Sequence, residues 1–328
     1  MPSIIDTRNQ MIQFVFPEHA NNLGTLHGGR LMDWIMLAGS ITSSRIAKGI
    51  TVLGASDSID FINPIKVGDI VVIDSWVEYI GNTSMELGIR VHSENLETGM
   101  RKLTTTSHLA FIAVDKDGKP RTVPNKINPS DRMEEEIYHE AQKRKDSRLS
   151  EISKLNNIKK NIVDDTVETR FKLETTKAVL PEDTFYGNFM SVGKLMKDID
   201  EIAAILAIRF ARGVMVTVSV DDLYFYSPIR VGDIIMLKAE LIYVGNTSLV
   251  IGLKVFSEDS NTFERRYTCT AFLNFVHLDD SGKPKHLPKY TPDTPIEIML
   301  WKEAAARKER RTNRVNNIKK FAYDYIPQ

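Results

Sequence analysis

The stretch Asn21-Asn22-Leu23-Gly24-Thr25-Leu26-His27-Gly28-Gly29-Arg30-Leu31-Met32-Asp33-Trp34-Ile35-Met36 joins a polar loop to a long apolar segment. Apolar residues continue on most faces through Ile41, which predicts a buried helix over about 28–47. The Gly28-Gly29 pair lets a ligand approach the backbone closely at the helix start. Unpaired N–H groups and the positive end of the helix dipole favour partial negative charge there.

The same pattern returns 164 residues later, in Met190 to Ala204, so the chain is a tandem duplication. Other motifs keep this offset without gaps, namely Phe61 with Phe225, Pro64–Ile70 with Pro228–Ile234, Tyr79–Ser84 with Tyr243–Ser248, and Gly118–Pro120 with Gly282–Pro284. We expect two domains, 1–160 and 161–328. Each ends in a charged helical extension, seen most clearly at 131–150 and 303–314.

Alternating apolar and polar residues predict an antiparallel meander around each helix. The expected strands of the first repeat are 7–16, 52–62, 69–80, 83–94 and 101–114. One early helix followed by antiparallel strands is an α+β arrangement. The sheet must wrap the helix, because nothing else in the repeat is apolar enough to cover it. We expect the repeats to form a pseudo-dimer, with sheets joined edge to edge and helices side by side.

Composition excludes several function classes. A formal net charge of zero gives no bulk electrostatic case for a nucleic-acid or anionic-membrane partner. Cys269 is the single cysteine, which excludes an internal disulfide and a Cys-based metal cluster, and its alternating context predicts a core or strand-surface thiol. There is no apolar run of spanning length and no signal peptide, so we expect a cytoplasmic protein.

Asp200 is the strongest candidate for chemistry because it lies on an apolar helix face with Met196, Ala203, Ala204 and Ala207. Limited water access there should raise its pKa, and such a carboxylate can act as a base or nucleophile. The alternative is a surface acid that pairs with Lys197.

Three further positions could complete such a site. The backbone of Gly28 and Gly29 can donate to an oxyanion. Asn21 can orient a water or a carbonyl group, or can simply form a turn.

Two more side chains carry both a functional and a structural interpretation. His27 is an alternative base because imidazole titrates near neutrality, but a loop histidine can also satisfy backbone groups, and Ser191 replaces it in the second copy. Thr217 can line the same site as Asp200, although strand propensity explains it equally well.

Together these motifs resemble the hotdog-fold acyl-CoA thioesterases. The shared motifs are Asn-x-Leu-Gly, His-Gly-Gly-x-Leu-Met, Phe-x-x-Pro-Ile-x-Val-Gly-Asp, Gly-Asn-Thr-Ser and Asp-x-Asp-Gly-Lys-Pro. The tandem form resembles the double-hotdog cytosolic acyl-CoA hydrolases. This resemblance implies two hotdog domains and hydrolysis of fatty acyl-CoA to fatty acid and CoA, with no metal and no cofactor. It also implies active sites between hotdogs and assembly as homo-oligomers, often trimers of double hotdogs.

The two copies differ where the family carries its acid. The motif Gly-Gly-x-Leu-x-x-x-x-Asp ends in Met36 in the first copy and in Asp200 in the second. The second copy also has Phe185 opposite Asn21 and Val192 opposite Gly28. We therefore expect one working composite site, in which Asn21, Gly28 and Gly29 act with Asp200.

Substrate-binding residues are suggested by position only. Cations for the CoA phosphates could come from Arg45, Arg209, Arg90 and Lys254, and the Gly-Asn-Thr-Ser turns add Thr83 and Thr247.

Two other functions stay open. A hydratase or dehydratase usually needs a His–Asp or His–Glu pair, and no Asp-x-x-x-x-His motif precedes either helix. A non-catalytic acyl-CoA sensor normally needs an effector module, and no residues remain to form one.

Overall fold

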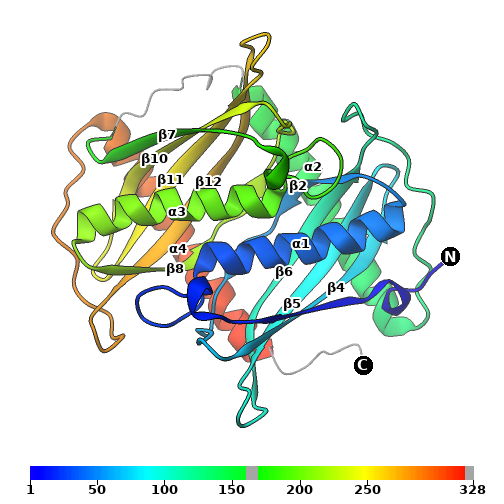
Figure 1. The fold of residues 1–328 in the computed structure, drawn as a ribbon, viewed down its shortest axis with the longest axis horizontal. Helices are drawn as coiled ribbons and strands as arrows, with labels where there is room; N and C mark the ends of the chain where they lie inside the picture. The colour runs from blue at the N-terminus through cyan, green and yellow to red at the C-terminus, as the bar shows by residue number, and fades with distance from the viewer. Residues whose placement is uncertain (160–168, 322–328) are drawn as a thin grey trace.

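The computed structural model describes residues 1–159 and 169–321 and contains two α+β repeats (Figure 1). The first repeat comprises β1 (Asn9–Phe14), α1 (Gly28–Ala47), β2 (Thr51–Ser56), β3 (Ile59–Asp60), β4 (Ile70–Ile80), β5 (Ser84–Glu94), β6 (Arg101–Ala113) and α2 (Arg132–Lys159). The second comprises β7 (Lys172–Ala178), α3 (Val192–Ala211), β8 (Val214–Val220), β9 (Leu223–Tyr224), β10 (Ile234–Val244), β11 (Ser248–Glu258), β12 (Arg265–Leu278) and α4 (Pro295–Phe321). The domain boundary expected at 160/161 lies outside the described residues.

Helix α1 has the bounds that the apolar pattern predicts. Leu31, Ile35 and Ala38 are buried against the sheet, and the helix ends where Lys48 adopts a left-handed conformation (φ 51°). Helices α1 and α3 lie side by side, each across the same face of its sheet (Figure 1). The start of each packs on the first half of the other, because Gly29 lies against Lys197 and Gly193 lies against Asp33. The helices are therefore antiparallel and related by an approximate two-fold axis.

Each sheet is antiparallel and ends in a short strand contributed by the other repeat. The strand orders are β1-β4-β5-β6-β2-β9 and β3-β8-β12-β11-β10-β7. The expected single strand 52–62 is therefore wrong in one respect: it is divided between β2, in its own sheet, and β3, which pairs with β8. The chain changes sheets at Ser58, whose N–H and hydroxyl both donate to Asp222 of the second repeat. This exchange joins the repeats at their edges, as the pseudo-dimer requires.

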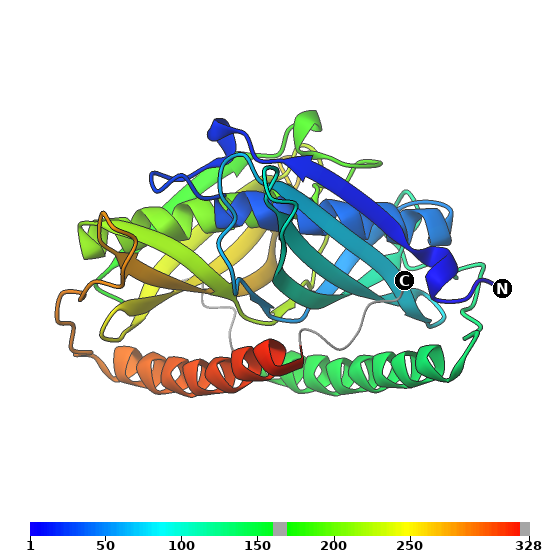
Figure 2. The same cartoon turned by 90° about the horizontal axis from the view of Figure 1, so that it is seen from below.

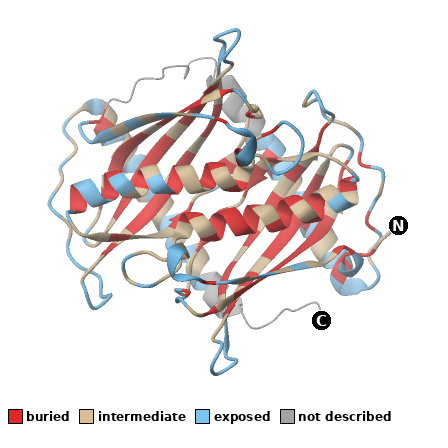
Figure 3. Cartoon of the chain, viewed as in Figure 1, coloured by how far each residue is buried: buried red, intermediate tan, exposed pale blue. Residues whose placement is uncertain are grey.

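The long helices α2 and α4 cover the outer faces of the sheets, opposite α1 and α3 (Figure 2). Their docking is largely ionic. Arg148 of α2 is paired with Glu86 and Asp57, and Arg311 and Arg314 of α4 are paired with Asp60. Buried residues are concentrated where the sheets contact α1 and α3 (Figure 3). Among the described residues, no helix is both long and apolar enough to cross a membrane.

Candidate active site

The Asp200 carboxylate is fully buried where α3 crosses the start of α1. Its Oδ2 accepts a hydrogen bond of 2.7 Å from the Gly29 N–H, and its Oδ1 accepts one of 2.6 Å from the Thr217 hydroxyl. His27 Nδ1 lies 3.1 Å from Oδ2. Lys197, the alternative partner of Asp200, pairs instead with Glu201. The structure thus brings Gly29, His27 and Thr217 together with Asp200, at the site that the sequence suggests. Gly29 and His27 come from the first repeat.

Burial raises the pKa of Asp200 above its ordinary value, as expected for a carboxylate on an apolar helix face. The His27 charge and the hydrogen bonds from Thr217 and Gly29 act in the opposite direction and lower that pKa. The His27 side chain is 33% exposed, whereas Asp200 is completely enclosed. His27 therefore lies between the carboxylate and solvent.

The two glycines at the start of α1 have different tasks. The Gly29 N–H is already bonded to Asp200, whereas the Gly28 N–H donates to no protein group within the described ranges. A Cβ atom at Gly28 would lie 2.9 Å from Thr217 Cβ and 3.5 Å from the Phe61 ring. Only the Gly28 amide is therefore available to a ligand. Phe61 thus lies beside the Gly28 amide, which the sequence does not predict. Its recurrence as Phe225 is the sequence feature that could have indicated it.

Asn21 organises the loop that leads into α1. Its Oδ1 accepts hydrogen bonds from the Leu23 N–H, the Thr25 N–H and the Thr25 hydroxyl. The Asn21 Nδ2 group makes no hydrogen bond to any residue that the structure describes. The acceptor end of Asn21 thus forms a turn, while its donor end remains available. Its catalytic role stays a prediction.

The substrate-binding positions chosen by location lie away from Asp200. Arg45 and Arg209 are exposed in the last turns of α1 and α3, and Arg45 is roughly 25 Å along α1 from Gly28. Thr83 and Thr247 lie at hairpin turns, where their carbonyls accept hydrogen bonds from Ala113 and His277. In the part of the chain that is described, none of these four bonds to Asp200. Their contact with substrate stays a prediction.

Cys269 is a core thiol. It is fully buried in β12, and burial raises its pKa to about 12. A thiol that stays protonated near neutrality is a poor nucleophile. The expectation of a structural cysteine is confirmed.

Comparison with known proteins places the chain in a family. The model described as thioesterase superfamily matches residues 23–100 and, again, 187–264. The uncharacterized acyl-CoA thioester hydrolase YkhA of Bacillus subtilis (strain 168) is 42% identical over 154 residues, 46% of this chain and 90% of that protein. The chain belongs to the thioesterase superfamily. Within it, the expected tandem hotdog fold and the acyl-CoA thioester hydrolase class are confirmed.

Other relatives match either most of this chain or about half of it. The mouse cytosolic acyl coenzyme A thioester hydrolase is 27% identical over 303 residues, covering 89% of this chain and 80% of that protein. The structure of an apo-hexameric acyl-CoA thioesterase is 37% identical and covers 46% of this chain and 96% of its own (TM-score 0.43). A Staphylococcus aureus acyl-CoA hydrolase solved with butyryl coenzyme A and coenzyme A is 32% identical and covers 48% and 97% (TM-score 0.44).

The approximate two-fold axis of this thioesterase generates a second composite position with different chemistry. Met36 takes the place of Asp200 and is fully buried. Leu53 corresponds to Thr217, and Val192 corresponds to Gly28. A thioether and two aliphatic side chains cannot accept a proton from water. The two positions therefore correspond in sequence but carry different side chains.

Proposed function

We propose that the chain hydrolyses fatty acyl-CoA to a fatty acid and CoA at a single composite site centred on Asp200. One observation carries the proposal: the Asp200 carboxylate of the second repeat is held by the Gly29 N–H of the first, at 2.7 Å. A buried carboxylate with a raised pKa, at a helix start rich in glycine, supports acid–base chemistry on an acyl group.

In the proposed reaction, ionised Asp200 removes a proton from a water molecule whose oxygen attacks the thioester carbonyl carbon. The carbonyl oxygen becomes an oxyanion, which the Gly28 N–H and the Asn21 Nδ2 group stabilise by hydrogen bonding. When the oxyanion collapses, the C–S bond breaks and the thiolate leaves. Protonated Asp200 returns its proton to that thiolate, so the enzyme is regenerated and the products are fatty acid and CoA.

The neighbours of Asp200 act as positioning residues in this scheme. Thr217 and Gly29 each bond one carboxylate oxygen, so the side chain cannot rotate freely. His27 is the partly exposed contact of the carboxylate and holds its Oδ2 atom from the solvent side. The proposed chemistry uses no metal and no cofactor, because CoA is part of the substrate.

The cellular setting is part of the same proposal. We place the enzyme in the cytoplasm, as the mouse relative's name states of that protein, with acyl-CoA as its partner and no nucleic-acid or membrane partner.

We propose a homo-oligomer, a trimer of double hotdogs. Light scattering should then give a mass about three times the chain mass of 37.2 kDa. A monomer at micromolar concentration would exclude the trimer.

The test is free-thiol release from a panel of acyl-CoA chain lengths. Asp200→Asn should lower kcat by about a hundred- to ten-thousand-fold, as expected for loss of a general base. Asp198→Asn is the matched control, because Asp198 lies on the same helix and pairs with Lys177. Retention of half the activity in Asp200→Asn would indicate two working sites. Binding of acyl-CoA without thiol release would indicate a sensor, and hydration of an enoyl-CoA without thiol release would indicate a hydratase.

A further inference from the structure

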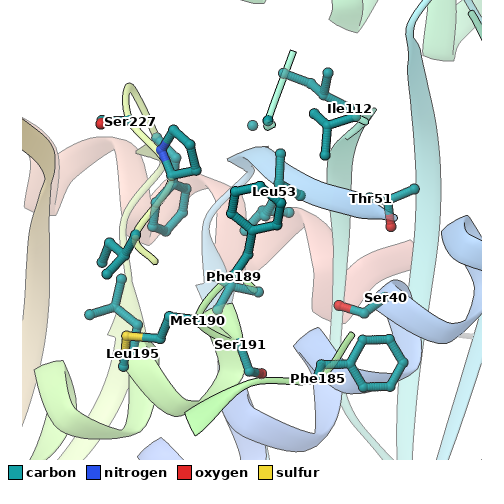
Figure 4. Close-up of a pocket in the computed structure, with 18 of the residues that line it drawn as sticks. Ser40, Thr51, Leu53, Ile112, Phe185, Phe189, Met190, Ser191, Leu195 and Ser227 are labelled. Atoms are coloured by element: carbon teal, nitrogen blue, oxygen red, sulfur yellow. The ribbon is translucent and has the colours of Figure 1, made fainter. Parts of the chain in front are cut away.

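A cavity of about 170 Å³ lies at the second composite position, beside Leu53 and Val192, which correspond to Thr217 and Gly28. It lies between the repeats, with Leu53 and Ile112 on one side and Phe189, Met190 and Leu195 on the other (Figure 4). The sequence predicts only the loss of catalysis at this position. Cavity volume depends on how the two repeats pack, which sequence patterns do not reveal.

The lining corresponds to the Asp200 site, with each reactive group replaced. Under the 164-residue offset, Leu53 stands for Thr217, Val192 for Gly28 and Phe185 for Asn21. Ser191, which stands for His27, makes no capping hydrogen bond through its side chain. The position retains a largely apolar pocket but lacks the groups proposed to activate water.

The size and polarity of the cavity fit a hydrocarbon chain. Apolar cavities of about 150 Å³ bind benzene-sized molecules and otherwise stay dry. A space of this size can take several methylene groups, and removing them from water is favourable. An acyl chain is the ligand class that matches both features.

A cation lies beside the cavity and can select the polar end of such a ligand. The Arg230 guanidinium lies 5.1 Å from the centre of the Phe189 ring. Arg230 Nη2 also lies 3.3 Å from where a Cβ at Gly118 would be, and both Phe189 and Gly118 line the cavity. Arg230 is half-buried and donates to the Asp117 carbonyl, so it is held in place. A carboxylate or a phosphate near the opening would gain a charge-assisted hydrogen bond.

We propose that this cavity binds the acyl chain of a fatty acid or an acyl-CoA without hydrolysing it. The proposal goes beyond the hydrolytic function and does not rest on it, because binding here is measured without turnover. Failure of either proposal leaves the other standing.

The test uses a thiol placed in the cavity. Ser191→Cys introduces a half-buried thiol, and Ser150→Cys on α2 is the control at an exposed serine outside the cavity. The native Cys269 is buried and gives little background. At about ten times its Kd, dodecanoate should slow iodoacetamide alkylation at position 191 by about tenfold, with no effect at position 150. Equal alkylation rates with and without dodecanoate and dodecanoyl-CoA would overturn the proposal, as would equal protection by CoA alone.

A second pair of variants locates the ligand. Ser40 lines the cavity and corresponds to Ala204 on the other side of the two-fold axis. Ser40→Leu should fill the cavity, abolish the protection at position 191 and leave thiol release unchanged, whereas Ala204→Leu should leave the protection intact. Protection that survives Ser40→Leu would place the ligand elsewhere. If Ser40→Leu does not fold, Ser227→Leu fills the same cavity from a loop.

Dodecanoyl-CoA is tested on the Asp200→Asn background so that it is not consumed. Protection by dodecanoyl-CoA but not by dodecanoate would identify the thioester as the ligand, and the reverse would identify the free acid. Either pattern supports an acyl-chain site. Arg230→Gln should raise the concentration needed for half-protection, and an unchanged value would remove Arg230 from the site.

Discussion

The Asp200 carboxylate accepts a hydrogen bond from the backbone N–H of Gly29, a residue 171 positions earlier in the chain. Donor and acceptor belong to different repeats, so neither repeat contains the site by itself. The same bond lies at the crossing of α1 and α3, where an added Cβ on Gly29 would be 3.0 Å from Asp200 Cβ. The candidate site therefore exists only where the two repeats pack together.

Asn21 offers a test that separates loop formation from catalysis. Asn21→Asp keeps the oxygen that accepts from Leu23 and Thr25, but it removes the Nδ2 donor. We expect kcat to fall by about a hundred- to a thousand-fold, the usual effect of removing one oxyanion donor. On the Asp200→Asn background the same change should add little, because residues that act as a unit are not additive. Wild-type kcat in Asn21→Asp would limit Asn21 to forming the loop.

The acid side of the pH–rate profile should report on Asp200. Because burial raises its pKa and the carboxylate must be ionised, kcat/KM should fall with decreasing pH about a midpoint above the ordinary 3.8. His27 lowers the pKa of Asp200, so His27→Ala should move that midpoint to higher pH while the fall persists. Disappearance of the fall in His27→Ala would identify His27 as the base instead.

The raised pKa of Asp200 also predicts how the free energy of unfolding depends on pH. The folded pKa of Asp200 lies above the unfolded value of 3.8, so its contribution to stability is full below pH 3.8 and is lost as pH rises through the folded pKa. Asp200→Asn cannot ionise, and its oxygen can still accept from Gly29. Urea unfolding should show similar stabilities of variant and wild type below pH 3.8 and a more stable variant at pH 7. A difference that shrinks with rising pH would show that the pKa is lowered in the folded state.

Gly29 and Gly193 form a matched pair at the helix crossing. A Cβ at Gly29 would lie 3.2 Å from Lys197 Cα, and one at Gly193 would lie 3.0 Å from Asp33 Cα. Each alanine substitution should lower the free energy of unfolding by about 1–3 kcal/mol through overpacking. Only Gly29→Ala displaces Asp200, so only that variant should lose kcat when assayed well below its melting temperature. Equal kinetic losses in both variants would show that activity follows the crossing distance alone.

The docking of α2 depends on a buried guanidinium. Arg148 pairs with the buried Glu86, so Arg148→Met should leave an unpaired carboxylate and lower the free energy of unfolding by about 3–5 kcal/mol. Adding Glu86→Met should restore most of the loss. Arg132→Met on the same helix is the control, because the Arg132 side chain is 92% exposed and its pair with Glu136 should contribute only about 0–1 kcal/mol. Equal losses at both arginines in denaturant unfolding would contradict this account.

Features set by local pattern could be predicted from sequence. The α1 bounds follow from the glycine pair at its start and the Lys48-Gly49 end, and the burial of Asp200 follows from its apolar helix face. The strand 52–62 was predicted as continuous because alternation looks the same whether or not a strand changes sheets. Arg45 and Arg209 are cations in the last turns of α1 and α3, and sequence alone does not give their distance from Asp200.

Features created by contact between the repeats could not be predicted. The sequence suggested that Gly28 and Gly29 both donate to an oxyanion, but the crossing of α1 and α3 bonds the Gly29 N–H to Asp200. The cavity beside Leu53 likewise depends on packing distances. The duplication predicted which positions correspond, and the structure was needed to show which of them touch.

The replacement of Asp200 by Met36 across the two-fold axis has a consequence for how such a protein changes over time. In a dimer of identical subunits, every substitution appears twice, so a mutation that alters one active site alters the other. Here the two helix positions are encoded separately. One pocket can therefore acquire a new ligand by mutation and selection while the other keeps its reaction, a freedom that a symmetric ancestor would lack.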